Sequence, residues 1–281
     1  MSRPEAPRAQ ERRSGEHPPG RRTSRTPAVT PVPRERRHTL HFLSFARSAS
    51  PVFLDTEVDA AALLADRAAD PRPVSVVTYV VQAVGRVLDR HPDANAACSG
   101  GPRPRRIRYP FVDVKLTMDR ESAGTRVVLT SVLPDADRAS RSFLQHRIDR
   151  LRAGDPATMP EFAGARALQR LPFPAGRLAF TLAGRLGRRH RHLGTVAVTS
   201  LGHRRVQRFF STGGTALTIG VGRITPRPVV RDGTVTVTPV LPLSLTFDHR
   251  VLDGALAADV LDDLAETLER PPEPEPGDAT R

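Results

Sequence analysis

The chain has 281 residues and a formal net charge of +13, from 43 Lys and Arg residues against 30 Asp and Glu residues. No apolar stretch has the length of a membrane-spanning helix, and the single cysteine, Cys98, excludes both an intrachain disulfide and a cysteine pair for a structural metal site. The N-terminus lacks the apolar segment of a secretion signal, so we expect a cytoplasmic protein.

The positive charge by itself does not indicate a nucleic-acid-binding protein. Lys115 is the sole lysine, so the basic balance is almost wholly arginine, and only 5% of the residues are aromatic. The sequence has no nucleic-acid-binding motif and few side chains on which bases could stack. We therefore expect no specific nucleic-acid partner, although loose binding to a polyanion stays open.

Composition divides the chain into one folded domain and two tails. Residues 1–38 carry ten arginines, four acidic residues and few bulky apolar residues, which predicts a disordered N-terminal tail. Residues 271–281 are rich in proline and predict a second disordered tail. The folded domain is expected to span residues 39–270.

In chain order, the first elements predicted are a strand over 51–59 and helices over 60–69 and 75–90, the second of which is ended by Pro92. Alternation of apolar residues predicts strands over 111–118 and 126–133. Asp137 or Ser140 is expected to cap the helix that follows.

The second half of the chain predicts more strands than helices. Strands are expected over 194–200 and 215–224, then a hairpin that turns at Asp232–Gly233 into 234–240, and a last strand over 241–247. A helix over 255–269 follows, with leucine and valine at four-residue spacing. The predicted fold class is α/β, a mixed β-sheet with helices packed on it.

His249 lies in the predicted turn between the last strand and the last helix, and Asp253 follows four residues later. An imidazole held at a strand end, with a carboxylate close by, is the arrangement that a general base needs. The alternative is that His249 is an ordinary polar residue and Asp253 an ordinary helix N-cap.

Three segments carry a resemblance to a known family: SVVTYVVQAVGRVLDRHPDANA (75–96), GTVAVTSLG (194–202) and LPLSLTFDHRVLDGALAA (241–258). In order and in residues they resemble the catalytic domain of the dihydrolipoamide acyltransferases of 2-oxo acid dehydrogenase complexes. Through that domain the chain is similar to chloramphenicol acetyltransferase. The resemblance spans roughly 45–269 and implies a two-layer sandwich of the chloramphenicol acetyltransferase type.

The resemblance implies a role for each matching residue. His249 would be the general base that takes a proton from a thiol, hydroxyl or amine acceptor, and Asp253 would orient it. Thr199 would stabilise the tetrahedral oxyanion, with Ser200 as the alternative if the register differs by one residue.

The resemblance also implies the substrates and the assembly. The acyl donor would be a thioester of coenzyme A, lipoamide or the phosphopantetheine of an acyl carrier protein, with no bound cofactor. The acyl group, the acceptor and the substrate-binding residues stay unassigned. The family's active site lies between subunits, so a homotrimer is expected.

The chain departs from the family in two places. Residues 1–38 are too short and too polar to be a lipoyl or subunit-binding domain, so we expect a free-standing enzyme. Residues 164–192 contain seven arginines and no acidic residue. This segment is either a solvated basic face, or an amphipathic surface for a membrane, an acidic carrier protein or a phosphorylated donor, and its prolines and glycines argue against one continuous helix.

His190, His192 and His203 lack a cysteine or carboxylate at matching spacing, so we expect no metal site and place all three on the same basic surface. Two alternative functions stay open. One is a catalytically idle trimeric scaffold with the same fold, and the other is a protein that binds surfaces through its basic segments.

Overall fold

The computed structural model describes residues 31–99, 103–185 and 187–271. All helices and strands described here belong to one compact unit, Pro33–Arg281. Most of the predicted N-terminal tail and the predicted tail 271–281, apart from Pro271, lie outside the described residues.

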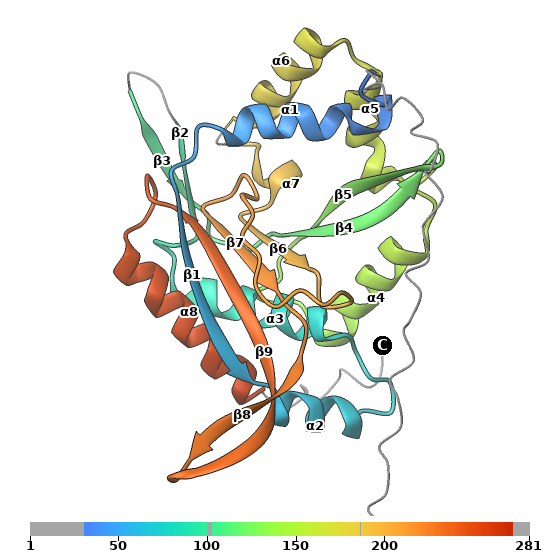
Figure 1. The fold of residues 1–281 in the computed structure, drawn as a ribbon. Helices are drawn as coiled ribbons and strands as arrows, with labels where there is room; N and C mark the ends of the chain where they lie inside the picture. The colour runs from blue at the N-terminus through green and yellow to red at the C-terminus, as the bar shows by residue number, and fades with distance from the viewer. Residues whose placement is uncertain (1–30, 100–102, 186, 272–281) are drawn as a thin grey trace, which may run out of the picture. The chain divides into compact units, whose positions relative to one another are not determined.

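A seven-stranded mixed sheet forms the centre of this unit, with the path β1-β9-β7-β6-β4-β5 and β8 paired to β9 (Figure 1). Its strands are β1 (Pro51–Asp59), β4 (Val114–Ser122), β5 (Thr125–Leu133), β6 (Val196–Ser200), β7 (Leu217–Val221), β8 (Thr225–Arg231) and β9 (Thr234–Asp248). β6 is parallel to both of its neighbours, β4 and β7. Antiparallel strands complete the sheet on both sides, so the predicted mixed sheet is confirmed.

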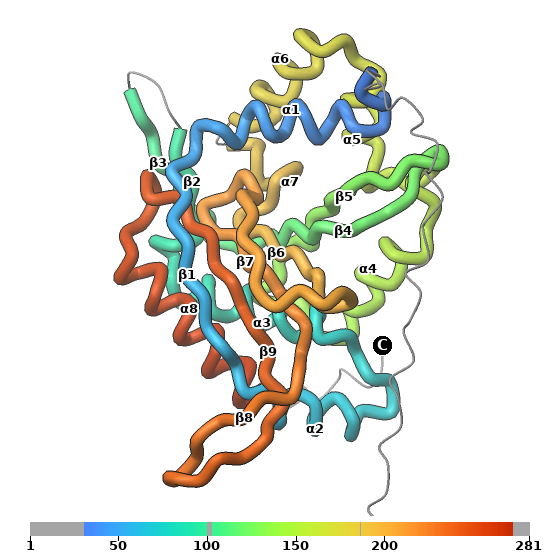
Figure 2. The backbone as a smooth tube through the Cα atoms, viewed as in Figure 1, coloured from blue at the N-terminus to red at the C-terminus, as the bar shows by residue number. Residues whose placement is uncertain are grey.

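The two predicted C-terminal strands are one continuous strand. β9 pairs with β8 through Thr234–Val240 and then with β1 through Val240–Asp248. The predicted turn joins β8 to β9 at Asp232 and Gly233, whose φ values of 49° and 77° are those of a two-residue hairpin turn. The same strand therefore builds a projecting hairpin, visible below the sheet in Figure 2, and ends at the turn that carries His249.

Two long helices cover one face of the sheet, α3 (Val76–Arg90) and α8 (Gly254–Glu269). Both are amphipathic, and their apolar residues share one core with Leu241, Leu243, Leu245 and Phe247 of β9. Ser75 begins α3 by accepting a hydrogen bond from the backbone N–H of Thr78 at 3.3 Å. The helix α4 (Arg141–Ala153) begins in the same way at Ser140, one of the two predicted caps.

Helix α1 (Arg37–Ala46) lies over the opposite face of the sheet, where Phe42 contacts the ammonium group of Lys115. α6 (Phe173–Ala183) packs beside α1 (Figure 1). The other helices are η1 (Arg34–Arg36), α2 (Ala61–Ala69), η2 (Pro160–Phe162), α5 (Ala163–Arg170) and α7 (His190–Leu193), and a separate two-stranded sheet consists of β2 (Ala96–Ser99) and β3 (Arg105–Arg108).

The folded segment starts earlier than the predicted boundary at residue 39. η1 and α1 begin at Arg34 and Arg37, although their composition predicted a disordered tail. These helices fold because α1 turns His41, Phe42 and Phe45 toward partners in α6. The pairing connects segments about 135 residues apart, and no local pattern could have predicted it.

The segment 164–192 forms three short helices, as its prolines and glycines predicted. Within the described ranges, no helix has the length and apolarity needed to cross a membrane.

Candidate active site

The turn after β9 fixes His249 through its backbone. The backbone N–H of His249 donates to the carbonyl of Ser50 at 2.9 Å, and the ring of Phe247 lies 5.7 Å from the imidazole between ring centroids. The side chain of His249 is half-exposed. The imidazole is therefore anchored at its base and open to a ligand on its outer side.

Asp248 holds the turn together. It is buried and accepts hydrogen bonds from the guanidinium of Arg250, from the backbone N–H of Arg250 at 3.2 Å and from the backbone N–H of Ser50 at 3.2 Å. Burial alone would raise the pKa of Asp248, but these hydrogen bonds outweigh burial and hold the pKa below its usual range. The carboxylate thus ties the end of β9 to the residue before β1.

Asp253 lies where the sequence predicted it, beside the histidine. Its Oδ1 is 3.4 Å from Nδ1 of His249, and its side chain is 88% exposed. Asp253 also occupies the N-cap position of α8, but its side chain makes no capping hydrogen bond. Its carboxylate is therefore free to interact with the imidazole, as a solvent-exposed neighbour.

Thr199 and Ser200 project to opposite sides of β6, as successive strand residues do. Ser200 accepts a hydrogen bond from the backbone N–H of Gly202 at 3.4 Å. The hydroxyl of Thr199 has no hydrogen-bond partner among the described residues, although the residue is only partly exposed. Because a hydroxyl that accepts a hydrogen bond keeps its own proton, both side chains can donate to a ligand, on opposite sides of the strand.

Within one chain, the structure does not bring His249 and Thr199 together. The register places Thr199 beside Gly220 of β7, and Gly220 beside Ser244 of β9. His249 follows Ser244 by five residues, which is roughly 15 Å along a strand, and two strand spacings add to that separation. A single site that uses both residues therefore needs two copies of the chain.

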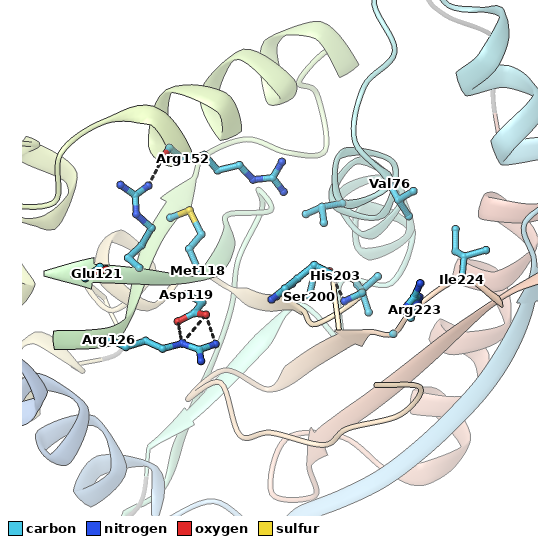
Figure 3. Close-up of a pocket in the computed structure, with 15 residues that line it drawn as sticks. Val76, Met118, Asp119, Glu121, Arg126, Arg152, Ser200, His203, Arg223 and Ile224 are labelled. Atoms are coloured by element: carbon cyan, nitrogen blue, oxygen red, sulfur yellow. Dashed lines mark hydrogen bonds and ion pairs between the residues drawn. The ribbon is translucent and has the colours of Figure 1, made fainter. Parts of the chain in front are cut away.

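A cleft of about 1020 Å³ opens beside Ser200, at the end of β6 (Figure 3). Ser200, His203, Met118 of β4, Val76 of α3 and Arg223 after β7 contribute to its walls. Apolar and cationic side chains thus line the same space. Arg126 and Asp119, also in the wall, are paired with each other.

Arg152, Arg223 and His203 have no ion-pair partner among the described residues. His203 is exposed, as predicted for the basic surface. His190 is not on that surface, because its Nδ1 lies 2.9 Å from Oδ2 of Asp113 and its ring packs on Phe111. The prediction that all three histidines share one basic surface is thus wrong for His190.

A buried pair of cations lies on the face of the sheet covered by α1. Lys115 is 2% exposed and Arg189 is 7% exposed, and they donate to the carbonyl oxygens of Gly213 and Gly214 respectively. Burial, and then the charge of Arg189, lowers the pKa of Lys115 to about 7. In the register of the sheet, Lys115 lies in the same row as Ala197, Thr218 and Thr246.

Comparisons with known proteins identify similar sequences and similar folds. Residues 180–274 match the family model described as 2-oxoacid dehydrogenases acyltransferase (catalytic domain). A segment of 53 residues is 47% identical to the dihydrolipoyllysine-residue acetyltransferase component of the pyruvate dehydrogenase complex of Bacillus subtilis. The predicted resemblance to this acyltransferase family is thereby confirmed.

Solved structures of related fold are similar to this chain over most of its length. The structure of the dihydrolipoamide acetyltransferase of Azotobacter vinelandii superposes with a TM-score of 0.64 at 21% identity, covering 86% of this chain and 92% of that one. The structure of a probable dihydrolipoamide acetyltransferase from Listeria monocytogenes gives 0.63 at 20% identity, covering 86% and 94%. The predicted fold of this acyltransferase family is therefore confirmed.

The sequence match is narrower than the fold match. It covers 19% of this chain and 12% of the Bacillus subtilis protein, so the chain spans only a small part of that relative. The residues of this chain that match the family model, 180–274, include Thr199, His249 and Asp253. The crystallographic work on the Azotobacter vinelandii acyltransferase concerned the catalytic role of one serine, one histidine and one asparagine.

Sequence reasoning missed the residues that hold the site in shape. Asp248 and Arg250 flank His249, and a carboxylate and a guanidinium two residues apart are a visible signal for an ion pair across a turn. Ser50 gave no signal, because its contact with His249 joins residues 199 positions apart. Lys115 was marked only by being the sole lysine in an arginine-rich chain.

Proposed function

We propose that this protein is an acyltransferase that moves an acyl group from a thioester donor to a thiol, hydroxyl or amine acceptor. The observation that carries the proposal is the half-exposed imidazole of His249, anchored by Ser50 and beside Asp253, together with the free hydroxyl of Thr199. The family match over 180–274 supports the same chemistry.

The reaction needs no covalent enzyme intermediate. His249 takes the proton from the acceptor, whose heteroatom attacks the thioester carbonyl, and the Thr199 hydroxyl donates to the resulting oxyanion. Collapse of the tetrahedral intermediate breaks the carbon–sulfur bond, and the leaving thiolate takes the proton back from the imidazolium. Asp253, whose Oδ1 lies 3.4 Å from Nδ1, orients the imidazole during the transfer.

The site is proposed to assemble between subunits of a homotrimer. The separation of His249 from Thr199 within one chain supports this assembly. The β8–β9 hairpin supports it too, because Val230, Val235 and Val237 on one of its faces are 71%, 68% and 75% exposed. Apolar ribbons of this kind are normally covered by a partner.

Coenzyme A, lipoamide and the phosphopantetheine of an acyl carrier protein are all candidate carriers of the acyl group. The cleft beside Ser200 supports an anionic carrier, because Arg152, Arg223 and His203 line it together with apolar Met118 and Val221. A phosphorylated thiol carries both kinds of group. We place the enzyme in the cytoplasm, where thioester donors of this kind are made, and its single cysteine is compatible with a reducing compartment.

Thiol release from a panel of acyl-coenzyme A donors tests the proposal, with dihydrolipoamide as the acceptor. Wild type is expected to release thiol, and His249→Ala is expected to lose the activity while it keeps its fold and oligomeric mass. The panel is repeated with acylated carrier protein, so that the choice of carrier does not decide the result. No histidine-dependent release from any donor would favour a catalytically idle scaffold of the same fold. Binding to polyanions that survives His249→Ala would favour a basic surface-binding protein.

A further inference from the structure

The segment between α4 and β6 builds a surface that the acyl-transfer reaction does not use. We propose that the outer side of α6 docks the protein on an anionic lipid bilayer. In Figure 1, α6 and α1 lie side by side, away from the projecting β8–β9 hairpin. The proposal is independent of the catalytic function.

α6 has an inner and an outer side. Phe180 packs against Phe42 and Phe45 of α1, at 6.1 Å and 5.5 Å between ring centroids, and Gly176 lies directly against the ring of His41. These contacts define the inner side and explain why α6 needs glycine there.

Leucines occupy the outer side of α6. Leu178 and Leu182 are one helical turn apart and point away from α1, with 61% and 44% of their surface exposed. Phe173, at the first turn, packs on the ring of His41 at 5.0 Å between centroids and so belongs to the inner side. A helix that packed only against its own protein would carry polar residues on its outer side.

The positive charge near these leucines favours an anionic membrane as the partner of this surface. Residues 164–192 contain seven arginines and no acidic residue, and Arg177, Arg185 and Arg188 are exposed around the leucines. Leucines that project from a helix with arginines at their edge suit the boundary between acyl chains and phosphate headgroups. Guanidinium groups bind phosphate, and an anionic leaflet attracts clustered arginines.

Co-sedimentation of the full-length protein with vesicles tests the proposal. One set is phosphatidylcholine alone and the other contains about 30% phosphatidylglycerol, a fraction that gives a strongly negative surface. Wild type is expected to sediment with the anionic vesicles and to leave most of the neutral ones unbound. Leu178→Ser/Leu182→Ser is expected to weaken anionic binding about tenfold or more, because it removes the inserted side chains.

Two further variants separate the contributions. Arg177→Gln/Arg185→Gln is expected to reduce the preference for anionic over neutral vesicles. Phe143→Ser, which removes a similarly exposed apolar side chain from α4, is the matched control and is expected to bind as wild type does. The leucine variants leave the arginine-rich N-terminal segment intact, so a loss of vesicle binding reports on α6 alone.

Three results would overturn the proposal. In the first, wild type stays in the supernatant with both kinds of vesicle. In the second, the leucine variants bind as tightly as wild type does. In the third, the leucine substitutions would lower the oligomeric mass in solution, which would make this face a contact between copies of the chain.

Discussion

His249 and Thr199 lie near opposite ends of the same sheet, one after the last residue of β9 and the other near the end of β6. Two pairing steps, Thr199 to Gly220 and Gly220 to Ser244, fix this separation. This separation supports the proposal that the site assembles between copies of the chain.

Mixing two inactive variants tests this relationship. His249→Ala and Thr199→Ala are each expected to lose most activity alone. In any trimer that contains both variants, one of the three interfaces combines an intact His249 from one subunit with an intact Thr199 from the next, which is about one third of the sites. Co-expression and purification of doubly tagged trimers should therefore restore about that share of wild-type activity. If both residues act within one chain, mixing restores none.

The hydroxyls of Thr199 and Ser200 are expected to differ in their contribution to the rate. Thr199→Ala should lower kcat by about 10² to 10³, the usual loss for one oxyanion donor. Ser200→Ala should have a smaller effect, because the resemblance assigns the oxyanion role to Thr199 and Ser200 projects to the opposite side of β6. Thr199→Ser keeps the donor and is the control. The reverse ranking in steady-state kinetics would assign the oxyanion role to Ser200.

The sequence predicted the elements whose signals are local. The alternation in β9, the Asp232–Gly233 turn and the spacing of α8 all appear where they were expected, and Ser140 caps α4. α1 was missed because its stability depends on Phe180 and Gly176, which lie far along the chain. His190 was misplaced for the same reason, since its partner Asp113 is 77 residues away.

The candidate site, too, could be predicted only where its signals are local. His249, Asp253 and Thr199 could be named from motifs, because each lies in a short segment typical of the family. The separation of His249 from Thr199 depends on the order β9-β7-β6, which strand patterns alone do not determine. The hydrogen bond from the backbone of His249 to Ser50 could not be predicted either, because it depends on how distant segments pair.

Asp248 and Asp253 are expected to act on His249 to very different degrees. Asp248→Ala removes the acceptor that ties Arg250 and Ser50 to the turn, so His249 should shift and kcat should fall about 10²-fold. Asp253→Ala removes a carboxylate that is 88% exposed, and its loss should cost about fivefold or less, as for other exposed ion pairs. Steady-state kinetics on the two variants measures both effects, with thermal unfolding as the check that the fold survives. Equal losses would contradict this distinction.

The cleft beside Ser200 is expected to recognise the anionic part of the donor. Arg152→Glu/Arg223→Glu should raise KM for an acyl-coenzyme A about tenfold or more, because charge-assisted hydrogen bonds to phosphate become repulsive contacts. KM for the corresponding acyl-pantetheine, which lacks phosphate, should change little. Arg191→Glu alters an exposed arginine outside this cleft and serves as the control. A similar rise in KM for both donors would show that the two arginines do not recognise phosphate.

Lys115 is expected to make stability increase with pH. Its pKa is about 7 in the folded protein, against 10.5 for an exposed lysine, so the unfolded chain binds more protons between these values. The free energy of unfolding should therefore rise from pH 7 toward pH 10, as the buried ammonium loses its proton. Below pH 7 both states are protonated, and the destabilisation caused by the buried charge is fully present.

Lys115→Met removes that charge while keeping a flexible side chain of similar length. The variant should be more stable than wild type at pH 7, by an amount on the order of a few kcal/mol, less the loss of the hydrogen bond to Gly213. The difference should shrink between pH 7 and pH 9.5, because only wild type gains stability from deprotonation. Denaturant unfolding of both proteins at the two pH values measures this change. A difference that stays constant with pH would mean that Lys115 keeps its proton in the folded protein, held by Gly213 and the face of Phe42.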